Sequence, residues 1–273
     1  MTKSKIGIVG FGTVGYAVHV FWHGHHINIY DPVVKPNGTK EGINECDVAF
    51  VCVSTPSLPD GRCDTSIVEE VVDWLTCPLI VIKSTVEPGT TAKLIARYPE
   101  KHIVFSPEFI GQGSYHSPFK LQKAMVESDY YIFGGCSEDT SAAVDLYLLV
   151  AGPNKRYIQC HPTAAEMSKY VTNSYFATKI LFCYEMASIC KAAGIDWNVV
   201  RELWLLDPRV EQSHTAVFAG QEQPFGGACF PKDTAALVAW AQSINAYSPQ
   251  LSRTITTNRA WCNRPRQITE GGS

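Results

Sequence analysis

The sequence lacks an excess of positive charge, a long apolar run and any closely spaced pair of cysteines. Its 23 Lys and Arg against 26 Asp and Glu give a formal net charge of −3, so no basic surface for nucleic acid is expected. Glycines interrupt the apolar run after Lys5, and no segment reaches the roughly 18 uninterrupted apolar residues of a membrane span, so neither a signal peptide nor a membrane helix is expected. The ten cysteines show no CxxC spacing, which argues against zinc, and a long chain without a leader argues against a disulfide scaffold. We therefore expect a cytoplasmic protein with free thiols and no bound metal.

A glycine-rich turn joins the first expected strand to the first expected helix. An apolar strand at 6–9 runs into Gly10-Phe11-Gly12-Thr13-Val14-Gly15, a helix follows at 16–22, and a second strand at 27–30 ends at Asp31. An acidic residue about 20 positions after the first glycine is where a dinucleotide-binding fold places the acceptor for ribose hydroxyls. This order predicts dinucleotide binding by Gly10, Phe11, Gly12, Thr13, Val14, Gly15 and Asp31. Because the Asp31 carboxylate would repel the 2′-phosphate of NADP, NAD is the expected cofactor.

The near-continuous apolar run at 47–53 is expected as a strand buried on both faces, and further strands are expected at 79–82, 102–105, 130–133 and 156–159. Helices are expected between them, and a capping box at Ser66 is expected to open one of these. The loops at the carboxyl ends of the strands meet at one crevice in a doubly wound sheet. The residues of these loops expected at the ligand site are Thr55, Pro56, Ser84, Thr85 and Glu108.

After residue 160 the pattern is helical throughout. A second capping box at Thr163 opens a segment that has no glycine or proline until Gly194, which gives a helix of about 45 Å at 1.5 Å per residue. Lys169 and Asn173 lie four residues apart, so they share one face of this helix unless they are only part of a solvated polar stripe. Shorter helices are expected at 197–206, 233–243 and 251–261.

We predict a doubly wound α/β fold, a Rossmann-type NAD-binding domain, over 1–160, followed by an all-α domain over 161–263 with a long central helix. The segment 264–273 is polar and is expected to be a loose tail or an expression remnant. The long helix carries more aromatic and branched surface than a small domain readily buries, so we expect a homodimer built on it. The side chains that motivate this prediction are Tyr170, Phe176, Ile180, Phe182 and Tyr184.

The stretch from Phe225 to Asp233 contains the one cysteine whose neighbours in the sequence favour a reactive thiol. Gly226 and Gly227 let the backbone pass close to a ligand, and Cys229 precedes Pro231, which suits the first turn of a helix. Amides at a helix N-terminus and the neighbouring Lys232 both favour a thiolate. Cys229 is therefore a candidate nucleophile, and packing is the alternative role for a cysteine.

Five stretches together resemble the UDP-glucose 6-dehydrogenase group of the UDP-glucose/GDP-mannose dehydrogenase family, from residue 6 to about residue 263. The first is the glycine fingerprint. The others are Ser84-Thr85-Val86 with Pro88-Gly89-Thr90, Pro107-Glu108-Phe109, Ala165-Glu166-Met167-Ser168-Lys169 with Asn173, and Gly226-Gly227-Ala228-Cys229-Phe230-Pro231-Lys232-Asp233. The resemblance implies two successive hydride transfers to NAD, which take the C6 alcohol of a UDP-sugar to a carboxylate through a thiohemiacetal and a thioester on Cys229.

The resemblance also assigns roles to the remaining residues. Lys169 and Asn173 would stabilise the developing C6 oxyanion, Glu108 would assist the water that hydrolyses the thioester, and Asp233 with Thr85 would hold a catalytic water. Further cofactor contacts are expected from Thr55, Pro56, Ser84, Thr85, Gln112 and Lys232. Substrate contacts are expected from Glu108, Phe109, Ile110, Lys169, Asn173, Arg209, Phe225, Gly226 and Cys229.

Two departures from the family pattern leave alternatives open. Gln112 stands where the family usually has a second glutamate near the nicotinamide, and an amide cannot act as a base. Family members continue into a third domain that encloses the UDP, whereas this sequence ends at Ser273, so UDP recognition is expected to be weaker, to come from another chain, or to rest on Arg209 and the loop 214–225. The alternatives are oxidation of GDP-mannose or UDP-N-acetylmannosamine, a two-electron hydroxyacid dehydrogenase, and a shortened chain that binds NAD and dimerises without turnover.

Overall fold

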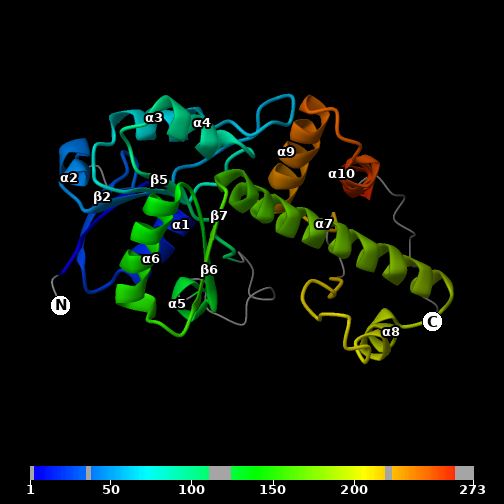
Figure 1. The fold of residues 1–273 in the computed structure, drawn as a ribbon. Coiled ribbons are helices and arrows are strands. Elements are labelled where there is room, and N and C mark those ends of the chain that lie inside the picture. The colour runs from blue at the N-terminus through cyan, green and yellow to red at the C-terminus, as the bar shows by residue number, and fades with distance from the viewer. Residues whose placement is uncertain (1–2, 35–37, 111–123, 219–222, 262–273) are drawn as a thin grey trace. The chain divides into compact units, whose positions relative to one another are not determined.

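The computed structural model describes residues 3–34, 38–110, 124–218 and 223–261. The chain separates into two compact units, Met1–Val171 and Thr172–Ser273. We describe each unit by itself (Figure 1).

The first unit is built on a seven-stranded sheet with the order β2-β1-β3-β4-β5-β6-β7. Neighbouring strands pair in parallel except β5 and β6, which pair antiparallel at Phe105 and Gly134. The strands are β1 (Lys5–Val9), β2 (His26–Tyr30), β3 (Val48–Val51), β4 (Ile80–Ile82), β5 (Ile103–Phe105), β6 (Tyr130–Gly134) and β7 (Arg156–Cys160). The order reverses between β1 and β3, and this switch point is where doubly wound sheets bind their ligands. The predicted fold class is confirmed.

Helices cover both faces of this sheet (Figure 1). They are α1 (Thr13–Phe21), α2 (Lys40–Asn44), α3 (Ser66–Trp74), α4 (Thr90–Arg97), α5 (Ala124–Glu127) and α6 (Ser137–Ala151). Alternate strand residues enter two different cores: Phe50 packs with residues of α1 and α6, and Val51 packs with residues of α3 and α4. Because both faces are covered, the central strands β3, β4 and β5 are continuous apolar runs in the sequence.

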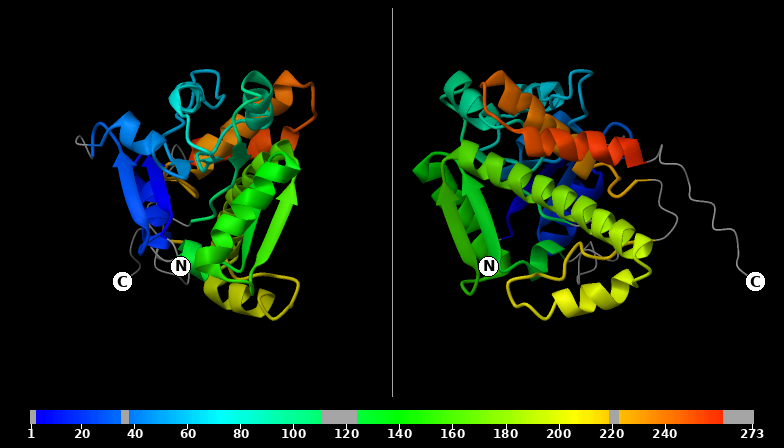
Figure 2. Two further views of the ribbon diagram at one scale, coloured as in Figure 1. Left: turned by 60° about the vertical axis from the view of Figure 1, so that its left-hand side comes forward. Right: turned by 90° about the vertical axis from the view of Figure 1, so that its right-hand side faces the viewer.

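The second unit is helical. Helix α7 (Pro162–Ala192) begins in the first unit and continues into the second, and Figure 2 shows it as one uninterrupted helix. It ends before Gly194, whose φ of 72° is the left-handed conformation that favours glycine. The other helices are α8 (Trp197–Trp204), α9 (Phe230–Ser243) and α10 (Pro249–Trp261). Helices α9 and α10 pack together, and the core of this unit contains Ala177, Ile180, Leu181, Tyr184 and Phe225.

Both predicted capping boxes are wrong. Thr65, not Ser66, occupies the N-cap of α3, and Glu69 accepts a hydrogen bond from the Thr65 hydroxyl at 2.9 Å. Helix α7 begins at Pro162, one residue before the expected cap, because proline suits the first helical position. Glu166 then turns to another element: it is fully buried and accepts the backbone N–H groups of Gly89 (2.5 Å) and Thr91 (2.7 Å) at the start of α4.

Candidate active site

The glycine-rich turn between β1 and α1 has the shape that a dinucleotide requires. Gly10 has a φ of 88°, and a Cβ there would lie 2.7 Å from the carbonyl oxygen of Cys52. A Cβ on Gly15 would lie 2.0 Å from the carbonyl oxygen of Gly10, so the turn and the helix can meet this closely only through glycine. A Cβ on Gly12 would meet nothing within 4 Å. The approach to the N-terminus of α1, which starts at Thr13, is therefore open to a pyrophosphate.

The side chains of this turn divide between core and surface. Phe11 and Val14 are half-buried and pack against the core beneath α1, whereas Thr13 is exposed. The turn thus holds its position through its apolar members, and the exposed Thr13 lies at the start of α1, where a pyrophosphate would bind.

Asp31 ties the end of β2 to the glycine-rich turn. Its Oδ2 accepts the backbone N–H of Phe11 at 2.7 Å, and its Oδ1 accepts those of Val33 and Val34 at 2.9 Å each. Burial is the largest single influence and raises the pKa of Asp31, but the three backbone hydrogen bonds together outweigh it and leave the pKa below its ordinary value. Asp31 is therefore a carboxylate at neutral pH, placed where a ribose acceptor is expected.

The loops after β3 and β4 are joined by side-chain hydroxyls. Thr55 donates to the carbonyl oxygen of Thr85 at 2.8 Å, and Ser84 donates to that of Val53 at 2.7 Å. Both donors are buried, whereas Thr85 is half-buried and Pro56 is exposed. The hydrogen bonds from the Thr55 and Ser84 hydroxyls thus hold the two loops together. Of the four predicted ligand residues in these loops, Thr85 and Pro56 are the more exposed.

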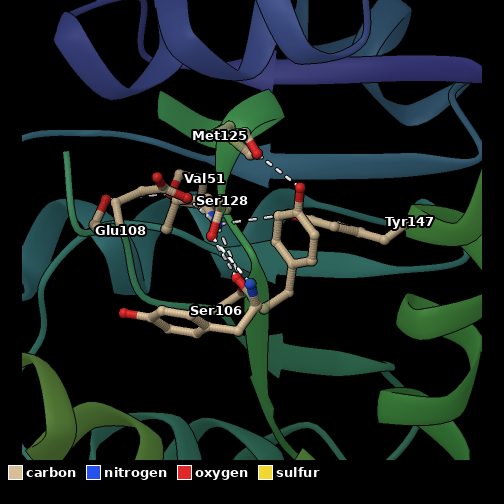
Figure 3. A network of polar contacts seen from close by, with 10 residues as sticks. Val51, Ser106, Glu108, Met125, Ser128 and Tyr147 are labelled. Atoms are coloured by element: carbon tan, nitrogen blue, oxygen red, sulfur yellow. Dashed lines mark hydrogen bonds and ion pairs between the residues drawn. The ribbon is translucent and has the colours of Figure 1, made fainter. Parts of the chain in front are cut away.

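Glu108 is part of a buried ion pair that sequence reasoning missed. The Nζ of Lys83, which directly follows β4, pairs with Oε1 of Glu108 and also donates to the Ser106 hydroxyl at 3.1 Å. Figure 3 shows Ser106, Glu108 and Tyr147 in this network. Burial would lower the pKa of Lys83, but the Glu108 carboxylate, with Tyr147 and Cys52, more than reverses this and raises it. A lysine at the end of an otherwise apolar strand was the available signal.

Lys169 lies on α7 with its ammonium over an aromatic ring. The Lys169 Nζ is 5.3 Å from the centroid of Phe109, and the Phe109 ring in turn contacts that of Tyr130 at 5.9 Å. Ile110 is half-buried and packs against the core on the α1 side of the sheet. Gln112 lies outside the described residues.

In the second unit Asn173 and Asp233 are in direct contact. The Asn173 side-chain amide donates to Asp233 Oδ2 at 2.5 Å, and the two residues are only 5% and 1% exposed. The ammonium of Lys232 lies 2.7 Å from the other oxygen, Oδ1, although it is not aligned with it as a hydrogen bond. The Asp233 carboxylate thus fixes the orientation of the Asn173 amide, which is one of the predicted oxyanion donors. The ammonium of Lys232 balances the negative charge of Asp233.

Cys229 lies at the N-cap of α9, with Pro231 in the first turn, as predicted from the sequence. Its carbonyl oxygen accepts the backbone N–H of Asp233 at 2.8 Å, so Cys229 and Asp233 lie one helical turn apart. The side chain of Cys229 is half-buried. A thiol at a helix N-terminus lies at the positive end of the helix dipole, which favours the ionised form of a cysteine there.

The other predicted substrate contacts differ in exposure. The Phe225 ring is 4% exposed and belongs to the core of the second unit, so only its backbone remains for a ligand. Gly226 borders Gln223, and Gly227 has a φ of 75°. Arg209 lies on the surface, where its guanidinium bonds the carboxylate of Asp207 at 2.6 Å and 3.0 Å.

No described cluster of three His, Cys, Asp or Glu residues could hold a metal ion. None of the helices in the described part of the chain is both long and apolar enough to cross a membrane. The nine cysteines that the structure describes are all free thiols.

The doubly wound sheet, the glycine-rich turn and Asp31 define the first unit as a dinucleotide-binding domain, and the second unit carries a cysteine beside an amide–carboxylate pair. Family comparison agrees with both parts. Residues 34–147 match the NAD binding domain of the UDP-glucose/GDP-mannose dehydrogenase family, and residues 163–260 match the family's central domain. The chain belongs to the UDP-glucose/GDP-mannose dehydrogenase family, and its predicted cofactor, NAD, is the one that the matched domain binds.

Individual relatives give the same result. A UDP-glucose 6-dehydrogenase of Haloferax volcanii is 31% identical over 230 residues, which are 77% of this chain and 51% of the relative. A GDP-mannose 6-dehydrogenase of Pseudomonas savastanoi pv. phaseolicola is 28% identical over 236 residues, 80% of this chain and 52% of the relative. The solved structure of a UDP-glucose dehydrogenase from Pyrobaculum islandicum has a TM-score of 0.81 at 25% identity and covers 94% of this chain and 68% of that one. The chain thus spans about half the length of the curated relatives that it matches.

Proposed function

We propose that this chain carries the oxidation chemistry of a nucleotide-sugar 6-dehydrogenase that converts UDP-glucose to UDP-glucuronate. The observation that carries the proposal is Cys229 at the N-cap of α9, one turn from an Asp233 carboxylate that holds the Asn173 amide. A two-electron hydroxyacid dehydrogenase has no use for such a cysteine. A four-electron oxidation requires one, because the aldehyde must stay attached to the protein between the two steps.

The residues of the second unit supply covalent chemistry. NAD, when bound at the glycine-rich turn, supplies the hydride acceptor for both oxidations. The Cys229 thiolate forms a C–S bond to the C6 aldehyde, whose oxygen takes up a proton, and after the second oxidation the sugar is held as a thioester. Water then adds to the acyl carbon, the C–S bond breaks, and the thiolate is regenerated with release of the acid.

Charge stabilisation falls to Asn173 and Lys169. The Asn173 amide donates one hydrogen to Asp233, so the carboxylate fixes the plane in which the other N–H is presented to the C6 oxygen. Lys169 adds a positive charge, and the Phe109 ring beneath its ammonium restricts where that charge lies. A preoriented donor of this kind is worth about 3–4 kcal/mol of transition-state stabilisation in comparable sites.

Counting NADH against added sugar tests the proposal. UDP-glucose should yield two NADH per sugar, and GDP-mannose and UDP-N-acetylmannosamine, offered in parallel, should react more slowly. One NADH per substrate would point to simple alcohol oxidation. NAD binding without NADH formation from any of the three sugars would contradict the proposal and leave a chain that binds NAD without turnover.

A further inference from the structure

Lys83 is the most deeply buried ammonium among the described residues, at 2% exposure. It follows the last residue of β4, and its backbone N–H still bonds the carbonyl oxygen of Val51 at 2.9 Å, so the sheet fixes its backbone. An ammonium taken out of water is costly unless charged and polar partners replace the water. The groups that contact the Lys83 ammonium therefore indicate the role of this buried charge.

Three partners surround the three hydrogens of this ammonium. They are Oε1 of Glu108, the Ser106 hydroxyl at 3.1 Å and, more weakly, the Tyr147 hydroxyl at 3.5 Å. Ser106 and Tyr147 are at most 1% exposed, and neither brings a formal charge. Burial raises the pKa of Tyr147, which keeps it a neutral phenol. Glu108 is thus the only carboxylate that touches Lys83 within the described part of the chain.

The two oxygens of Glu108 have different surroundings. Oε1 is held by Lys83, whereas Oε2 has no hydrogen-bond partner among the described residues, and Glu108 as a whole is 9% exposed. A carboxylate held at one oxygen can rotate little, so the other oxygen points in one direction.

We propose that Lys83 is a positioning residue that holds Glu108 by one oxygen and so fixes the orientation in which the other oxygen accepts a proton from the water that hydrolyses the thioester. This rests on the proposed function. In the step, the water oxygen bonds to the acyl carbon, Glu108 Oε2 takes one water proton, and the C–S bond breaks with Cys229 leaving as thiolate. Lys83 keeps its three protons throughout, because its raised pKa makes it a poor acceptor.

The test compares Lys83→Met, Glu108→Gln and the double variant with wild type. Methionine keeps the length and the apolar stem but removes the charge, and Lys93→Met, at an exposed position on α4, is the matched control. Lys83→Met should form both NADH of the first turnover normally and then accumulate acyl-Cys229 in intact-protein mass spectra, with kcat about 100-fold lower and the KM for UDP-glucose within about 3-fold of wild type. Full kcat in a folded Lys83→Met protein would overturn the proposal.

The double variant separates positioning from mere support of the fold. If Lys83 acts only through Glu108, adding Lys83→Met to Glu108→Gln should change kcat less than about 2-fold. A further loss of about 10-fold would mean that Lys83 has a role of its own and would refute the proposal. The same comparison decides the matter if Lys83→Met alone does not fold, because the double variant leaves no unpaired buried carboxylate. A wild type that makes no NADH contradicts the proposed function instead.

Discussion

Cys229 owes its proposed reactivity to the residue at which α9 begins. Pro231 suits the first turn, so the chain before it forms the N-cap, and Cys229 lies at the positive end of the helix dipole. The same sulfur one turn later would face a filled hydrogen-bond ladder. Position on the helix thus distinguishes Cys229 from cysteines such as Cys52, whose thiol pKa is raised by burial.

Variants of Cys229 and Glu108 should stall at different steps. Cys229→Ser can still hold the sugar, but an alkoxide is a far poorer leaving group than a thiolate, so the ester should persist on residue 229. Glu108→Gln should accumulate the thioester on an intact Cys229, because water is poorly activated. Intact-protein mass spectrometry after mixing with UDP-glucose and NAD measures both adducts. Full activity in Cys229→Ala would exclude the cysteine as nucleophile.

Asp31 should set the preference for NAD over NADP. Its carboxylate is held by three backbone N–H groups at the end of β2, where a 2′-phosphate would bring a second negative charge. Asp31→Ala should weaken NAD binding about 10-fold and reduce the difference in affinity between NAD and NADP. Isothermal titration with each cofactor would measure both affinities. Exposed Asp60→Ala is a suitable control. Equal affinities of the wild type for both cofactors would contradict this role.

At the scale of whole elements, Glu166 connects α7 to the N-terminus of α4. Burial raises the pKa of Glu166, although the Thr91 and Gly89 amides partly offset this. A raised folded-state pKa means that the native protein binds the proton more tightly, so the contribution to stability is full below about pH 4.3 and declines as pH rises through the folded value. The free energy of unfolding of the wild type, minus that of Glu166→Gln, should therefore fall as the pH rises above about 4.3. Urea unfolding of both proteins, with exposed Glu100→Gln as control, measures this difference, and a rising difference would show the sign to be wrong.

The loop before Cys229 is fastened to α10 by one side chain. Asn258 is 3% exposed, accepts the backbone N–H of Phe225 at 3.0 Å and donates to the carbonyl oxygen of Phe225 at 2.9 Å. Asn258→Asp keeps the acceptor and loses the donor, which should cost about 1–3 kcal/mol of stability. The rate at which iodoacetamide alkylates Cys229 should change several-fold, and exposed Asn245→Asp should leave it unaltered. An unchanged rate would mean that the clamp does not reach the cysteine.

The sequence predicts elements well where a local pattern is enough. All seven strands were predicted, and the central ones most directly, because burial on both faces leaves a continuous apolar run, as in β3. Helix α2, only five residues long, was missed because it is too short to show a periodic pattern. The caps at Ser66 and Thr163 were misplaced, since the same Ser/Thr-x-x-Glu spacing also arises when the glutamate serves another element.

The residues of the candidate site also differ in whether a local sequence pattern is enough to predict them. Motif residues such as Asp233 could be found from spacing and family resemblance. Lys83 and Asn258 could not, because each acts on a partner at least 25 residues away, and nothing near them in sequence marks that partner. Long-range pairing of a buried polar group is settled by the fold, so only coordinates reveal it.

At the scale of the whole molecule, the expected dimer must be argued from different side chains than those that first suggested it. Tyr170, Ile180 and Tyr184 are buried within the chain itself, at 0%, 7% and 6% exposure, and offer nothing to a partner. Tyr175, Phe182 and Ile189 are instead 56%, 45% and 59% exposed. These three are spaced by seven residues, so they form one stripe along α7.

The neighbouring helix extends the apolar surface of the second unit. Val199 and Leu203, four residues apart on α8, are 57% and 64% exposed, and Phe182 contacts Trp204 of the same helix with ring centroids 5.9 Å apart. An exposed apolar stripe of this length on a long helix is a surface that a second copy can cover symmetrically. We therefore propose an isologous dimer in which α7 and α8 of one copy meet those of the other.

Charge placed in the middle of this stripe should separate the two copies. Wild type at micromolar concentration should scatter light with twice the chain mass of 30.1 kDa, and Phe182→Asp with Ile189→Asp should return it to the mass of one chain. Ile244→Asp changes an apolar side chain of similar exposure, 52%, at the end of α9 and should leave the dimer intact. The circular dichroism of the double variant should match that of the wild type, because both side chains already face solvent within one chain. A wild type that scatters as a monomer would exclude the dimer, and a dimer that survives both substitutions would place its interface elsewhere.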